Sequence, residues 1–431
     1  MTLTSRVPAL AAGTRGRALA ALCVTEITSY GVIYYAFPVL AGQVTAATGW
    51  SRASVTLAYS AGNLAGALAG IPAGRLLHRR GPRLVMTAAS VAGAACVAAI
   101  ALAPSYGWFV AAWLAAGTAT AGLYYPPAFA ALTAWYGQQR VRALTTLTLA
   151  AGFASTIFAP LASALAAQLS WRGVFLVLAA ILAAVTIPAH ALFLRPAWPH
   201  RQATAAPAGR EVTPPGPAPG GTVTRSRAFA QLAAAATLCA FAQYAALVNL
   251  VPLLEGRGMH AGLAAWALGL GGAGQVAGRL CYQLIASRLG AQGRAVGVIT
   301  AGAAATLLLG LLPGPAALLV IASVAAGAVR GVFTLTEATL VADYWGPGRY
   351  AILNGVFNAP VVAAGAIAPS AGAYIAAATG SYPALYVILA ATAAAGALLA
   401  AAAPPPARDR EERAAGPGES GPGQPGTRGQ R

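Results

Sequence analysis

The chain has 431 residues, of which 58% are hydrophobic and only 8% are charged, and its formal net charge is +18. Soluble domains usually carry about a quarter charged residues, so this composition excludes an ordinary soluble protein. The positive charge does not indicate nucleic-acid binding, because the arginines are spread between apolar segments and do not form one basic patch. The expected surrounding is therefore a lipid bilayer, and no nucleic-acid partner is expected.

Apolar stretches of about 20 residues recur along the whole chain, each long enough to cross a bilayer core as a helix. No stretch alternates like a barrel strand, and lipid cannot satisfy open backbone groups, so helices are predicted. The twelve predicted spans are 18–43, 53–77, 84–103, 108–134, 143–169, 173–194, 228–254, 261–287, 294–312, 315–341, 351–378 and 382–403. The fold class expected from this pattern is an all-α integral membrane protein with twelve transmembrane helices.

The distribution of arginine predicts the orientation of these spans. With the N-terminus inside, 22 of the 27 basic residues fall in or beside cytoplasmic segments, as the positive-inside rule requires. We expect a multi-pass monomer of the plasma (inner) membrane, with both termini cytoplasmic and no cleavable signal peptide. The predicted parts are a cytoplasmic tail at 1–17, a six-helix bundle at 18–195, a cytoplasmic linker at 196–226, a second bundle at 227–403 and a disordered cytoplasmic tail at 404–431.

The two predicted bundles share one plan, repeated without gaps at an offset of 209 residues. The matched pairs are Arg79 with Arg288, Gly81 with Gly290, Gly122 with Gly331, and Pro160 with Pro369. Internal repeats of this kind are typical of transporters whose two halves surround a site near the middle of the membrane. The repeat thus predicts two pseudo-symmetric six-helix bundles around a central site for a small molecule.

A signature follows the second span, with Gly74, Leu76, His78, Arg79, Gly81 and Arg83 in place. It resembles the G-x-L-x-D-R-x-G-x-R pattern of the major facilitator superfamily, with His78 replacing the acid. The second copy keeps Arg288 and Gly290, and has Gln283 and Ser287 in place of the first glycine and the aspartate of the pattern. The resemblance, over residues 18–403, implies the major facilitator fold, and a structural or gating role for Arg79, Arg83 and Arg288.

Two further stretches look like the monocarboxylate porters and their bacterial oxalate:formate relatives. They are SYGVIYYAFPVL with GWSRASVTLAYS, and the eighth span GAGQVAGRLCYQLIASRLG. The resemblance implies a carboxylate substrate, bound by Arg279 in the place of those porters' substrate-binding arginine. Their first-span lysine falls near Tyr34, and their acid one turn before the arginine is Gln275 here.

The eighth span also carries a polar stripe that can be recognised without the family. The second span has a glycine at every fourth position, namely Gly62, Gly66, Gly70 and Gly74, which allows close helix packing. The matching positions of the eighth span, 209 residues further along the chain, are Gly271, Gln275, Arg279 and Gln283. Residues four apart share a helix face, so the polar side chains can act on one cavity. The alternative is that Arg279 is a structural charge bonded to backbone carbonyls at the bundle interface.

Three other charged residues lie within predicted spans and one lies at a span end. Glu26 and Arg279 are each about nine residues from the cytoplasmic end, which is about 13 Å deep and close to the midplane. Glu26 and Glu337 are therefore proton-coupling candidates, and a fixed ion pair is the alternative role for Glu26. We expect Arg330 to form a structural pair with Glu337, and Asp343 to serve packing or gating.

Uncharged polar residues and prolines give weaker indications. Asn249 and Asn358 are candidate substrate contacts, although polar groups in membrane helices more often bond a neighbouring helix. Prolines remove backbone donors, so bends are predicted at Pro126-Pro127 and, at matched positions, at Pro160 and Pro369.

No chemical motif in the sequence points to catalysis. The pattern Gly269, Gly271, Gly274 lies inside an apolar span, and the four cysteines lie in four different spans without metal spacing. We expect no enzyme activity, cofactor or metal. The predicted function is secondary active transport by alternating access, with proton-linked movement of a small organic anion. The alternatives are a proton-coupled exporter of a hydrophobic or cationic compound and a non-transporting membrane sensor.

Overall fold

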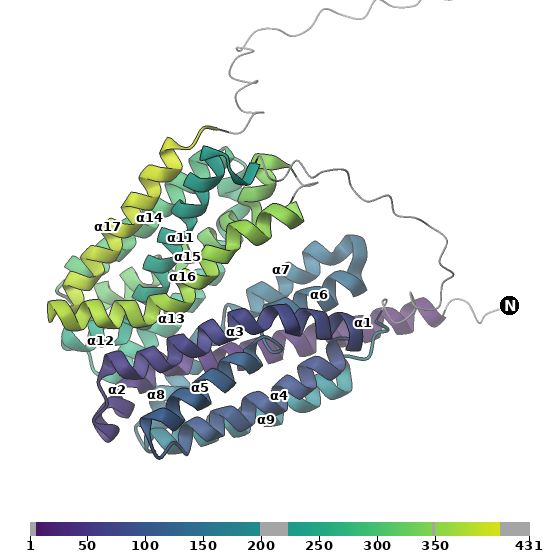
Figure 1. Ribbon diagram of the computed structural model, residues 1–431, viewed down its shortest axis with the longest axis horizontal. Helices are drawn as coiled ribbons and strands as arrows, with labels where there is room; N and C mark the ends of the chain where they lie inside the picture. Colours follow the sequence, from purple (N-terminus) through teal and green to yellow (C-terminus); the bar gives the residue numbers. More distant parts are fainter. Residues whose placement is uncertain (1–5, 199–222, 347–349, 406–431) are drawn as a thin grey trace, which may run out of the picture.

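The computed structural model describes residues 6–198, 223–346 and 350–405, and these residues are almost entirely helical (Figure 1). Residues 199–222 of the predicted linker and residues 406–431 of the predicted C-terminal tail lie outside them. The first helix begins at Arg6, so helix extends into the segment predicted to be a tail.

The helices form two groups that correspond to the two predicted bundles (Figure 1). The N-terminal group consists of α1 Arg6–Ser29, η1 Tyr30–Tyr35, α2 Ala36–Thr48, α3 Arg52–Arg80, α4 Pro82–Ala101, α5 Tyr106–Thr120, α6 Tyr125–Tyr136, η2 Gly137–Gln139, α7 Arg140–Ala151, α8 Ala154–Ala166 and α9 Trp171–Phe193. The C-terminal group consists of α11 Arg227–Val248, α12 Leu250–Gly256, α13 Ala261–Ala286, α14 Ala291–Leu311, α15 Ala316–Trp345, α16 Tyr350–Thr379 and α17 Tyr382–Ala402.

Several spans consist of two shorter helices. The first span changes to a π-helix over Tyr30–Tyr35, and the fourth breaks between α5 and α6, where the predicted bend at Pro126-Pro127 is confirmed. α8 runs through Pro160 and the fifth span breaks earlier, after Ala151, so the bend predicted at Pro160 stays a prediction. α16 likewise continues through Pro369. Prolines are tolerated inside membrane helices when neighbours satisfy the freed carbonyl groups.

Length and hydropathy mark nine described stretches as able to cross a membrane. They include one stretch over Tyr106–Ala166, which contains the predicted fourth and fifth spans together. α3 and α13 are long enough but are not among the nine. These are the repeat-matched second and eighth spans, whose glycine and polar stripes lower their mean hydropathy.

Glycines bring helices of each bundle into backbone contact. A methyl group added at Gly117 of α5 would overlap the Gly62 carbonyl oxygen of α3, and one added at Gly327 of α15 would overlap that of Gly271 in α13. Gly62 and Gly271 are repeat mates, so both halves use the same close packing. A methyl group at Gly70 would meet no other atom within 4 Å, so only Gly62 and Gly66 of the α3 stripe make such a contact.

Gly117→Ala is expected to destabilise the protein, because the added methyl group overlaps a backbone oxygen on a helix that cannot move independently. Overpacking of this kind costs about 1–3 kcal/mol. Gly70→Ala, on the same predicted stripe as Gly62, is the matched control and should melt at or above the wild-type temperature. Melting of the purified proteins in one detergent tests this, and equal melting temperatures for the two variants would show that the contact is not tight.

Candidate functional site

A cavity of about 360 Å³ lies between the two bundles, near the middle of the spans. Its polar lining from the N-terminal half consists of Tyr30, Tyr34, Tyr35, Asn63, Tyr124 and Tyr125. Its polar lining from the C-terminal half consists of Tyr244, Gln275, Arg279, Arg330, Thr334 and Glu337. One wall is therefore mostly aromatic, whereas the charged groups lie on the other.

The aromatic wall depends on breaks in two helices. The π-helix Tyr30–Tyr35 places Tyr30, Tyr34 and Tyr35 on the cavity, and insertions of this type often occur at functional sites. The break before α6 brings Tyr124 to a stacked contact with Tyr30, with ring centroids 3.9 Å apart. These rings therefore form a fixed surface, and not a set of independent side chains.

Arg279 projects from α13 across the cavity and contacts the other half. Its side chain is buried, its Nη1 donates to the Thr148 carbonyl oxygen, and it interacts electrostatically with the Tyr125 hydroxyl. Thr148 lies in the last turn of α7, where the helix dipole favours a cation. In the structure, Arg279 thus bonds a backbone carbonyl, as expected of a structural charge, and it also lines the cavity.

The rest of the polar stripe on α13 divides between cavity and surface. Gln275 is buried and lines the cavity one turn from Arg279. Gln283 is exposed and does not line it, so the stripe does not act on the cavity as a whole.

Glu26 is fully buried in the N-terminal half but does not line the cavity. Neither of its carboxyl oxygens has a hydrogen-bond partner among the described residues. It lies within electrostatic range of Tyr30, Tyr124 and Tyr125. Glu26 is thus close to tyrosines of the aromatic wall but does not itself line the cavity.

Arg330 and Glu337 of α15 both line the cavity, but the expected ion pair between them is not formed. Seven residues along a helix correspond to about 10.5 Å, which is two turns. Within the described ranges, the ion pair that does form joins Arg294 of α14 to Asp343 of α15, consistent with a packing role for Asp343.

The two asparagine candidates lie elsewhere. Asn249 separates α11 from α12, and its Nδ2 donates to the carbonyl oxygens of Ala245 at 2.9 Å and Pro369 at 3.5 Å. Asn358 does not line the cavity, and its Oδ1 is buried without a partner among the described residues. Neither residue contacts the cavity in this state, because the helix face of an isolated polar residue is set by tertiary packing.

The signature arginines lie away from the cavity at the ends of α3, α4 and α13. Arg79, Arg83 and Arg288 are exposed, and the Arg83 Nε donates to the Ala191 carbonyl oxygen at 2.8 Å. That bond ties the start of α4 to the end of α9. A gating role for the three arginines stays a prediction.

Sequence reasoning missed Tyr30, Tyr125 and a buried histidine. His190 of α9 bonds Ser90 of α4 through Nδ1 at 2.8 Å and Thr25 of α1 through Nε2 at 3.0 Å. The triad holds three helices of one half together, and none of its three residues lines the cavity. Tyr30 could have been found from its i, i+4 spacing to Tyr34.

Among the described residues, three hydrogen bonds that involve a backbone atom join the two halves. Ser370 N donates to Ser60 Oγ at 3.1 Å, Thr156 Oγ1 donates to the Gly269 carbonyl oxygen at 2.8 Å, and Arg279 donates to Thr148. α3 and α16 meet near Ser60 and Ser370 and diverge toward Arg80 and Tyr350 (Figure 1). Of the three bonds, that of Arg279 lies nearest the end where the halves separate.

The sequence model of the Major Facilitator Superfamily matches residues 22–320. The chain belongs to this superfamily. No curated protein sequence matches it significantly. As a major facilitator, with two helical halves around a cavity, it is a membrane transporter by family.

Solved structures of major facilitators share the fold. An inward-facing, occupied bacterial homologue of the human lysosomal transporter Spinster has a TM-score of 0.65 and 18% identity, covering 90% of this chain and 95% of that one. The nucleoside transporter NupG has a TM-score of 0.68 and 15% identity, and the match covers 89% of this chain and 98% of that one. At this identity the likeness concerns the fold, and it does not identify the substrate.

Proposed function

We propose that this major facilitator moves a small organic anion, of the monocarboxylate type, by alternating access linked to protons. The supporting observation is the charge of the central cavity, where Arg279 and Arg330 face one carboxylate, Glu337. A cavity with an excess of positive charge and low-dielectric walls concentrates anions. Guanidinium groups also match the planar, two-oxygen geometry of a carboxylate.

The contacts between the halves support a rocking motion. The halves share few hydrogen bonds and meet mainly through α3 with α16 and α8 with α13, so they can move as separate bodies. If the ends at Arg80 and Tyr350 are cytoplasmic, the present state is inward-facing. Closing these ends and opening the others would expose the same cavity to the outside.

Glu26 is the proposed proton carrier. An ionised carboxylate without a partner is costly in a dry interior, so the group is suited to carry a proton through the membrane. Tyr30 and Tyr125 lie near Glu26 and also line the cavity, so Glu26 is close to the proposed substrate path. Glu337, which lines the cavity directly, is the alternative carrier.

A second candidate function is export of a hydrophobic or cationic compound. It is favoured by the aromatic wall and by the carboxylate of Glu337, because tyrosine faces and a carboxylate together attract cations. The two arginines on the same cavity argue against it, because they repel a cation.

Counterflow into proteoliposomes distinguishes these functions, because exchange needs no driving gradient. Vesicles preloaded with an unlabelled compound should take up the same labelled compound for at least one carboxylate among pyruvate, oxalate and 4-hydroxyphenylacetate, and not for cationic dyes. Counterflow of dyes alone would support the exporter, and no counterflow in either group would favour a non-transporting sensor.

Cysteine labelling tests the proposed orientation. Thr222, in the predicted cytoplasmic linker and outside the described residues, should be inaccessible as Thr222→Cys to an impermeant reagent added to intact cells. The same variant should react after the cells are opened. Efficient labelling of intact cells would reverse the orientation.

A further inference from the structure

Arg330 is a membrane-embedded cation without a described partner. Its guanidinium makes no hydrogen bond or ion pair with any residue that the structure describes, and its Nε is buried without a partner. Arg279, by contrast, bonds the Thr148 carbonyl, and Arg294 bonds Asp343. Arg330 is half-buried and lines the central cavity. A charge left unpaired at membrane depth is costly, so Arg330 is suited to receive an anion from outside the protein.

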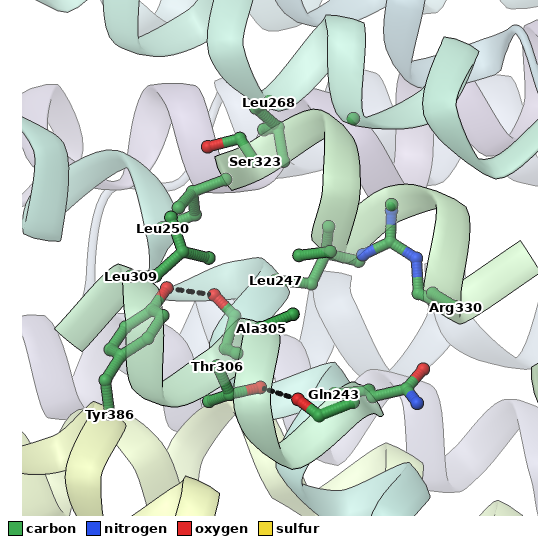
Figure 2. Close-up of a pocket in the computed structure, with 15 residues that line it drawn as sticks. Gln243, Leu247, Leu250, Leu268, Ala305, Thr306, Leu309, Ser323, Arg330 and Tyr386 are labelled. Atoms are coloured by element: carbon green, nitrogen blue, oxygen red, sulfur yellow. Dashed lines mark hydrogen bonds between the residues drawn. The ribbon is translucent and has the colours of Figure 1, made fainter. Parts of the chain in front are cut away.

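Arg330 separates the central cavity from a second, smaller pocket inside the C-terminal half. This pocket has a volume of about 40 Å³, and Figure 2 shows Arg330 on the side opposite Tyr386. It has room for a few water molecules, each of which needs about 10–15 Å³. Water on this side can hydrate the guanidinium while no ligand is bound.

The hydroxyl groups of the small pocket are already engaged. Tyr386 donates to the Ala246 carbonyl oxygen at 2.6 Å and Thr306 to that of Gly302 at 2.8 Å (Figure 2). Ser323 donates to the Leu319 carbonyl oxygen at 2.8 Å. No acidic side chain is among the described residues that line this pocket. An anion for Arg330 must therefore come from the central cavity.

On the cavity side, two tyrosine hydroxyl groups accompany Arg330. Tyr34 and Tyr244 both line the cavity and lie within electrostatic range of the guanidinium. The Tyr34 hydroxyl is buried and has no hydrogen-bond partner among the described residues. One guanidinium and two hydroxyl donors form a set that suits the two oxygens of a carboxylate.

We propose that Arg330, with Tyr34 and Tyr244, is the subsite that binds the carboxylate of the transported anion. This assignment rests on the proposed function. Arg279 then acts as a clasp between the halves, because a ligand that bound it would first have to break its bond to the Thr148 carbonyl. Tyr34 belongs to one half and Arg330 to the other, so a carboxylate held by both draws the two halves together.

The test compares KM and maximal rate in counterflow of the carboxylate that the wild-type protein moves best among pyruvate, oxalate and 4-hydroxyphenylacetate. Arg330→Gln should raise KM by about tenfold or more, because it loses a charge-assisted hydrogen bond. Arg330→Lys should give an intermediate KM. Arg279→Gln should mainly lower the maximal rate, and Glu337→Gln should not raise KM, because it removes a negative charge from the cavity that binds the anion.

Tyr34→Phe and Tyr244→Phe keep the test decisive if the Arg330 variants fail to fold, because each removes only a hydroxyl group. Each should raise KM by about twofold to tenfold. If the wild-type protein moves no carboxylate, the proposed function fails. If it does, but KM is unchanged in folded Arg330→Gln or in both tyrosine variants, the subsite alone is wrong. An equal rise in KM for Glu337→Gln would instead assign Arg330 to a pair with Glu337.

Discussion

Glu26→Gln is expected to abolish accumulation driven by a pH gradient while leaving substrate exchange intact. Glutamine keeps the size and polarity of the side chain but cannot release a proton, and exchange requires no net proton movement. For one proton per anion, the wild-type protein should accumulate substrate about tenfold per unit of pH gradient, and the variant should only equilibrate it. Uptake and counterflow in the same proteoliposome preparation measure both quantities.

Glu337→Gln is the matched control, since it removes the carboxylate that lines the cavity directly. If Glu26 carries the proton, this variant should still accumulate substrate. The reverse pattern, with accumulation lost in Glu337→Gln and kept in Glu26→Gln, would transfer the role to Glu337. Accumulation that is unchanged in both variants would remove the two carboxylates from coupling.

Arg279→Ala is expected to lower the transport rate by about tenfold or more, because it removes a charge-assisted bond worth about 1.5–3 kcal/mol. The bond crosses between the halves, so its loss changes the balance between inward-facing and outward-facing states. Arg279→Lys keeps the charge but not the planar fork, and should lose less. Initial rates and KM in proteoliposomes separate an effect on the clasp from an effect on ligand binding.

Arg172→Ala is a suitable control for this prediction. Arg172 also donates to a backbone carbonyl, that of Ala103 at 2.7 Å, but the bond lies within one half. Its loss should affect stability more than transport rate. Normal transport by Arg279→Ala would contradict a role for this arginine in either the clasp or the ligand site.

The fold is predictable from the sequence because its determinants are additive along the chain. Span length, arginine placement and the 209-residue repeat each depend on many residues, so errors at single positions do not change the result. The repeat also predicts that Gly62 and Gly271 occupy equivalent close contacts, as they do. The break after Ala151 shows the limit of such reasoning, because it does not lie at the proline of the fifth span.

The site is less predictable, because it depends on which face of each helix meets the cavity. Asn249 and Tyr34 are both polar residues within spans, but only Tyr34 lines the cavity, owing to the π-helix that begins at Tyr30. Arg279 can be found from its position on a polar stripe, whereas its partner Thr148 lies 131 residues away and has no sequence signal. The unpaired state of Arg330 likewise follows from tertiary structure alone.

Proton movement during substrate entry tests the central claim of proton-linked anion transport most directly. Proteoliposomes containing a trapped pH indicator should show saturable acidification of the lumen when a transported carboxylate is added outside, beyond the slow acidification of protein-free vesicles. Arg330→Gln should shift the half-saturating concentration upward, and Glu26→Gln should abolish the signal. Carboxylate entry without acidification would contradict proton coupling, and proton movement elicited only by cationic dyes would contradict transport of anions.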